Sequence, residues 1–152
     1  MGILQRMWHG TSAEEQLVSE LSDIAGRHQE LAERLARHAK SCIYPNIASG
    51  LASLAERASD HARALSAMLR ERQAWSKLPK APGADGSNNW ERVRLDLALL
   101  LELTRAMNRQ ALQWESVDAD FASLLRTIAT RDDRDLGELR ELALRCDPQA
   151  LD

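Results

Sequence analysis

The sequence predicts an all-α domain that folds as a four-helix bundle. Leu, Ala, Arg and Glu, which favour helices, dominate the 152 residues, whereas residues that favour strands are scarce. Apolar residues recur at alternating steps of three and four along four long segments, as they do on one face of a helix. Proline or capping residues separate most of these segments. A chain of this length is sufficient for one domain with a buried core.

The first predicted hairpin consists of helices over residues 13–41 and 45–76. Thr11 and Ser12, followed by Glu14 and Glu15, form overlapping capping boxes at the start. Pro45 begins the second helix, because proline is excluded from a helix interior but accepted in a first turn. The connection is very short, so we expect antiparallel neighbours. The expected inward faces are Leu17, Leu21, Ile24, His28, Leu31, Leu35, His38 and Cys42, and Ile47, Leu51, Leu54, Ala58, His61, Leu65, Met68 and Arg72.

The second predicted hairpin consists of helices over residues 89–115 and 119–145. Asn88 with Glu91 caps the first of them, and either Ser116 or Asp118 caps the second. The expected inward faces are Trp90, Val93, Leu97, Leu100, Thr104, Met107, Ala111 and Trp114, and Phe121, Leu124, Leu125, Ile128, Asp132, Asp135, Leu139 and Leu142.

A loop from Lys77 to Asn88, rich in Pro, Gly, Ser and Asn, separates the two hairpins. At about 3.3 Å per residue its span of roughly 40 Å is just enough to cross the length of a bundle. We therefore expect a crossover loop, with an up-down-up-down bundle as the alternative. Residues 1–12 are predicted to form an N-terminal arm, residues 13–147 the bundle, and residues 148–152 a C-terminal tail.

Composition and charge limit the classes of protein and partner. The net charge of −3 comes from interspersed acids and bases, so we expect no nucleic-acid partner. No stretch approaches the ~20 apolar residues of a membrane span, and the first residues lack the apolar run of a signal peptide. Cys42 and Cys146 lie in no metal-binding spacing, and we expect reduced thiols in a cytoplasmic protein. The run Leu95 to Leu103 of the third helix is apolar nearly all round, which favours a homodimer.

Four polar residues occupy inward positions that otherwise hold Leu, Ile, Ala or Met. They are His28, His61, Asp132 and Asp135. Counted from the hairpin turns at 1.5 Å per residue, they lie within roughly one helical turn of each other in height. Buried carboxylates and imidazoles are unfavourable unless they are paired or bind a metal. The sequence therefore predicts a polar layer at the middle of the bundle.

Two segments carry a resemblance to a known family. The stretch Tyr44-Pro45-x-Ile47-Ala48-x-x-Leu51-x-x-Leu54-Ala55, ending in Asp60-His61-Ala62, resembles the second helix of rubrerythrin-like members of the ferritin-like superfamily. Asn89-Trp90-Glu91-Arg92, followed by a long apolar helix, resembles their third helix. The resemblance implies a bundle with a crossover and metal ligands at mid-helix.

The ligand set departs from what the resemblance implies. The family's di-iron site takes a Glu from each of two helices and Glu-x-x-His from each of the other two. Here Ala58 stands three residues before His61, and Asp132 with Asp135 replaces the second Glu-x-x-His. His28 is the inward residue of the first helix, and on the third helix Leu97 and Leu100 hold that level, with Asp96 and Glu102 off the inward face. A standard di-iron centre is therefore not expected.

Three interpretations of the layer remain open. In the first, His28 and His61 hydrogen-bond to Asp132 and Asp135 in a metal-free network that fixes helix register. In the second, the same four residues bind a single zinc, iron or manganese ion. In the third, the register is wrong and some of these residues reach solvent. We expect His9 and His38 to be surface or helix-end residues rather than ligands.

The sequence contains no Ser/His/Asp order, phosphate-binding glycine loop or HExxH motif, which favours a non-enzymatic protein. We expect a structural or interaction module, with an unknown protein as a possible partner and no cofactor.

Overall fold

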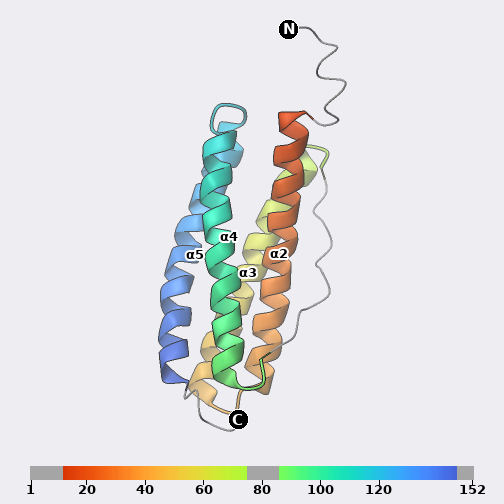
Figure 1. Cartoon of the computed structure of the whole chain (residues 1–152). Helices are drawn as coiled ribbons and strands as arrows, with labels where there is room; N and C mark the ends of the chain where they lie inside the picture. The colour runs from red at the N-terminus through yellow and green to blue at the C-terminus, as the bar shows by residue number, and fades with distance from the viewer. Residues whose placement is uncertain (1–11, 75–85, 147–152) are drawn as a thin grey trace, which may run out of the picture.

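The computed structural model describes residues 12–74 and 86–146, which form four helices (Figure 1). They are α2 (Ala13–Ser41), α3 (Pro45–Glu71), α4 (Asn89–Trp114) and α5 (Ala119–Arg145). The described residues contain no strand, so the predicted all-α four-helix bundle is confirmed. The predicted N-terminal arm (apart from residue 12), the C-terminal tail and most of the loop over 77–88 lie outside the described residues.

The helix ends follow local sequence signals. The Ser12 side chain accepts a hydrogen bond from the Glu15 amide, and the Glu15 side chain accepts one from the Ser12 amide, which completes the predicted capping box. Asn88 and Asp118 cap α4 and α5 in the same way through the amides of residues three positions later. The predicted end of the second helix at residue 76 is wrong, because α3 ends at Glu71 and Gln73 adopts a positive φ of 57°.

The helix directions define the topology. In Figure 1 α2 and α5 run down the page and α3 and α4 run up it. Asp118 at the start of α5 accepts a hydrogen bond of 2.9 Å from Arg72 just beyond α3, as antiparallel neighbours require. Each hairpin is antiparallel, α2 also packs on α4, and α3 packs on α5. Because α3 and α4 point the same way, the chain between them connects opposite ends of the bundle, which is the predicted crossover arrangement.

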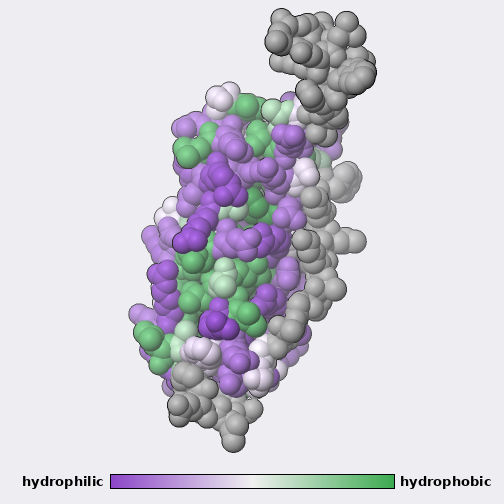
Figure 2. All heavy atoms as spheres, viewed as in Figure 1, coloured by the Kyte–Doolittle hydropathy of each residue, from purple (hydrophilic) through white to green (hydrophobic). Residues whose placement is uncertain are grey.

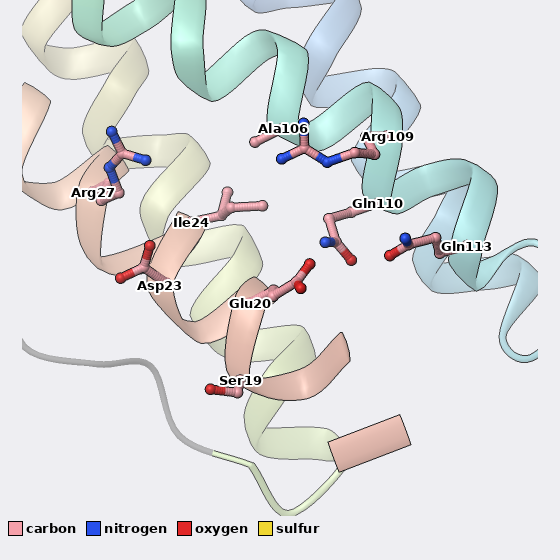
Figure 3. Close-up of a pocket in the computed structure, with 9 residues that line it drawn as sticks. All are labelled: Ser19, Glu20, Asp23, Ile24, Arg27, Ala106, Arg109, Gln110 and Gln113. Atoms are coloured by element: carbon pink, nitrogen blue, oxygen red, sulfur yellow. The ribbon is translucent and has the colours of Figure 1, made fainter. Parts of the chain in front are cut away.

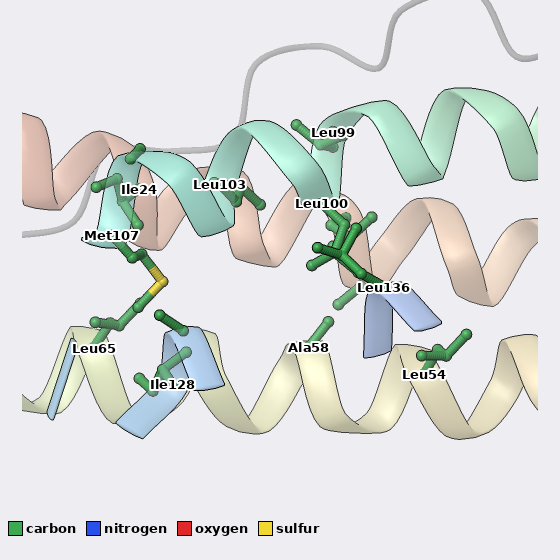
Figure 4. Close-up of a cluster of buried hydrophobic side chains, with 14 of the residues drawn as sticks. Ile24, Leu54, Ala58, Leu65, Leu99, Leu100, Leu103, Met107, Ile128 and Leu136 are labelled. Atoms are coloured by element: carbon green, nitrogen blue, oxygen red, sulfur yellow. The ribbon is translucent and has the colours of Figure 1, made fainter. Parts of the chain in front are cut away.

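The core is built in layers to which every helix contributes. Figure 4 shows Ile24, Leu65, Met107 and Ile128, one from each helix, gathered at one level. At a neighbouring level Ala58 and Leu100 approach Leu136. Close packing of such layers supplies most of the stability of helices in water.

The inward face of α4 differs from the predicted one. Leu97, which we expected to point inward, is only half-buried, whereas Asp96 and Leu103 have no exposed surface. The reason is a rotation of α4, which packs against α2 and α5 with the side of Leu99, Leu103 and Gln110 buried. On the face shown in Figure 2, polar residues predominate and apolar residues gather along α4. No helix in the described part of the chain is long and apolar enough to cross a membrane.

Candidate functional site

Three of the four predicted layer residues meet at the centre of the bundle. Asp132 of α5 lies between His28 of α2 and His61 of α3. Its Oδ2 is 2.9 Å from His28 Nε2, and its Oδ1 is 2.9 Å from His61 Nδ1. The exposed fractions are 0% for His28, 4% for His61 and 1% for Asp132. The predicted polar layer therefore exists, and it is buried.

Hydrogen-bond geometry indicates how protons are distributed in this His28–Asp132–His61 network. His28 Nδ1 lies 3.0 Å from the Ile24 carbonyl oxygen, which can only accept. Since the other ring nitrogen of His28 faces a carboxylate, both nitrogens have an acceptor to donate to. An imidazolium at His28 beside a carboxylate at Asp132 satisfies all of these contacts, and His61 needs only its Nδ1 hydrogen to complete them. The network is then neutral overall.

The histidines keep Asp132 ionised. Burial by itself raises the pKa of a carboxyl group, but the hydrogen bonds from His28 and His61 and the favourable electrostatic interaction with both imidazoles outweigh it and hold the pKa of Asp132 below its ordinary value. The carboxylate is therefore the stable form in the folded protein at neutral pH.

Asp135 does not join the network, contrary to our expectation. Its Oδ1 lies 2.8 Å from Arg57 Nε, and Arg57 also binds Glu138 at the edge of the bundle. Asp135 is one helical turn from Asp132 on the same side of α5, but its carboxylate extends to α3 rather than to the histidines. Burial raises the pKa of Asp135 despite the positive charge of Arg57.

A second buried His–Asp pair was missed from the sequence. His38 of α2 hydrogen-bonds through Nδ1 to Asp96 of α4, and Arg34 Nε lies 3.2 Å from Asp96 Oδ1. His38 is 2% exposed and Asp96 0% exposed, so the expectations that His38 reaches the surface and that Asp96 lies off the inward face are wrong. The one sequence signal was His38 itself, which continues the inward stripe of α2 four residues after buried Leu35.

The donor set limits which metals the network could hold. One ligand atom from each of His28, His61 and Asp132 lies within 4.8 Å of the others. Two imidazole nitrogens and a carboxylate fit a single zinc, iron or manganese ion by number and type. They do not fit a di-iron centre, because Ala58 stands where the Glu of a Glu-x-x-His pair is needed, and α4 holds this level with Leu103 rather than Leu97 or Leu100.

Neither of two comparisons with known proteins identifies a relative of this chain. No protein-family model matches the chain. A search of curated proteins also gives no match.

Proposed function

We propose that this chain is a ferritin-like bundle without a working di-iron centre, and that it acts as a structural or interaction module. The observation that carries the proposal is the His28–Asp132–His61 network, in which each carboxylate oxygen already meets an imidazole nitrogen at 2.9 Å. Such a network is satisfied without an ion, and its directional bonds join α2, α3 and α5 in one register.

The ligand positions support the same proposal. A redox centre of the ferritin-like type needs carboxylates from all four helices. Three residues before His61 α3 offers Ala58 in place of a carboxylate, and α4 offers Leu103, one turn before Met107. Asp135, the only other carboxylate expected in the layer, is engaged by Arg57. A cytoplasmic location remains part of the proposal, supported by Cys42 and Cys146, which are not joined in a disulfide.

Metal content tests the proposal directly. Protein purified without chelator and then incubated with iron, manganese and zinc is expected to retain substoichiometric metal after desalting, as measured by elemental analysis. The physical reason is that an ion would have to displace the proton between His28 and Asp132 and break two good hydrogen bonds. A matched His61→Ala variant should retain the same background amount.

A stoichiometric ion that disappears in His61→Ala would instead establish the second candidate, a mononuclear metal-binding protein. One observation favours that candidate: His28 directs Nδ1 to the Ile24 carbonyl, which is how many metal-binding histidines are oriented. In that case His28, His61 and Asp132 would be the ligands, and the ion would supply Lewis-acid or redox chemistry.

The interaction part of the proposal concerns α4. Leu97, Leu101 and Leu112 fall within about 60° of its circumference at roughly 100° per residue. The first two are half-buried, and Leu112 is 69% exposed. We propose that this leucine stripe is the contact of a homodimer.

A dimer through the stripe predicts a specific mutational result. Leu112→Glu should convert the protein to a monomer by light scattering without loss of helicity, because a charge would be buried in the contact. Leu144 on α5 is 86% exposed and is the matched control, so Leu144→Glu should leave the dimer intact. A wild-type monomer at high concentration, or equal effects of both variants, would contradict the proposed contact.

A further inference from the structure

A groove of about 370 Å³ lies between α2 and α4, separate from the His28–Asp132–His61 network. Figure 3 shows its walls: Glu20, Asp23 and Arg27 extend from α2, and Arg109 and Gln110 extend from α4. Ile24 forms part of the apolar floor. Polar groups of both helices therefore line the same groove.

Gln110 is the unusual residue of this groove. It is 1% exposed, and its Oε1 is buried without a hydrogen-bond partner among the described residues. Leaving a buried amide oxygen without a hydrogen bond is unfavourable, so such groups are rare in folded proteins. In Figure 3 the Gln110 amide extends into the space between the helices, toward Glu20. The amide nitrogen is the atom on the Glu20 side, and it is a donor at the wall of the groove.

The charged groups around Gln110 are of both signs. Glu20 and Arg109 are exposed, and neither forms an ion pair or side-chain hydrogen bond in the described part of the chain. Arg27, in contrast, is engaged by Glu102 at 2.7 Å. The groups that remain available at the groove are thus one guanidinium, the Glu20 carboxylate with the half-buried Asp23 nearby, and the Gln110 amide nitrogen.

We propose that this groove binds a small zwitterion with an ammonium and a carboxylate group, of the size of a free α-amino acid. The ammonium group would donate to the Glu20 and Asp23 carboxylates, which are acceptors. The carboxylate would pair with Arg109, whose planar guanidinium suits two oxygens, and would accept from Gln110 Nε2. An anion alone would face Glu20 and Asp23, and a cation alone would face Arg109, so the mixed lining favours a ligand with both charges.

The binding site involves none of the residues of the His28–Asp132–His61 network. It therefore goes beyond the proposed structural role, and it stands whether or not that network holds a metal. Since the groove is shallow and the contacts are few, we expect a dissociation constant on the order of 1 mM.

Titrations followed by amide NMR shifts test the site with three probes of matched size: L-alanine, ethylamine and propionate. L-alanine is expected to produce saturable shifts confined to the facing halves of α2 and α4, including the side-chain amide of Gln110. Ethylamine lacks the carboxylate and propionate lacks the ammonium group, so each should bind about tenfold more weakly.

Variants locate the contacts. Gln110→Leu and Arg109→Gln should each weaken L-alanine binding about tenfold. Gln113 also lines the groove but is exposed, so Gln113→Leu is the matched control and should change binding little. Arg109 is exposed, so its variant tests the site even if Gln110→Leu perturbs packing. Absence of saturable shifts with L-alanine, equal binding of ethylamine or propionate, or unchanged binding in Arg109→Gln would overturn the proposal.

Discussion

Asp132→Ala is expected to lower the free energy of unfolding by about 3 kcal/mol, measured by chemical denaturation. The substitution removes the one carboxylate that pairs with both His28 and His61, and it leaves nitrogens of two buried imidazoles without their partner. Since small domains are stable by only about 5–15 kcal/mol, the loss is a large part of the total.

Two companion variants separate the effect of the network from the effect of the substitution. Asp133 is the next residue and is exposed, so Asp133→Ala should change stability by less than about 0.5 kcal/mol. The combined replacement of His28 and His61 by Leu and of Asp132 by Met should be neutral or stabilising, because all three buried polar groups leave together. If Asp132→Ala were as mild as Asp133→Ala, the network would not be the register-fixing element that we infer.

The Asp132 carboxylate also predicts that the free energy of unfolding decreases in acid. The pKa of Asp132 is lower in the folded state than in the unfolded chain, so its contribution is complete above the unfolded value of about 4. It is lost as the pH falls through the folded pKa. Asp132→Asn should therefore show a shallower loss of stability on acidification than Asp133→Asn.

Asp96→Ala is expected to have an effect of similar size, about 3 kcal/mol, because it removes the carboxylate shared by His38 and Arg34. The Arg34 side chain is 12% exposed and His38 is 2% exposed, so neither can recover its hydration after the carboxylate is lost. Thermal or chemical denaturation at neutral pH measures the change.

Glu102 provides the matched control for Asp96 on the same helix. It also pairs with an arginine of α2, at 2.7 Å from Arg27, but its side chain is 64% exposed. Surface ion pairs contribute about 0–1 kcal/mol, so Glu102→Ala should be mild. Equal losses in the two variants would mean that burial does not set the energetics of the α2–α4 contact.

Much of the fold could be predicted from the sequence because its signals are local. Capping by Ser12, Asn88 and Asp118 and the first-turn Pro45 depend on neighbouring residues only. Helix α3 was the exception. Nothing in its local pattern marks the stop at Glu71, where Arg72 instead turns to Asp118 of α5 and lies over Phe121.

The polar layer could be predicted in part. His28, His61 and Asp132 stand out because each interrupts an apolar stripe, and counting from the turns places them at one height. Asp135 meets the same two criteria, yet it pairs with Arg57. The partner of a carboxylate depends on the direction of its side chain across the helix interface.

The sequence by itself determined the helices, their order and the depth of the polar layer, since periodicity, caps and helix rise are properties of one chain segment at a time. Only the tertiary structure decided which helices became neighbours and how far each was rotated. The rotation of α4 buried Asp96 against His38, and it placed Gln110 beside Glu20. Both outcomes depend on close packing between helices that are distant in sequence, and no local pattern encodes that packing.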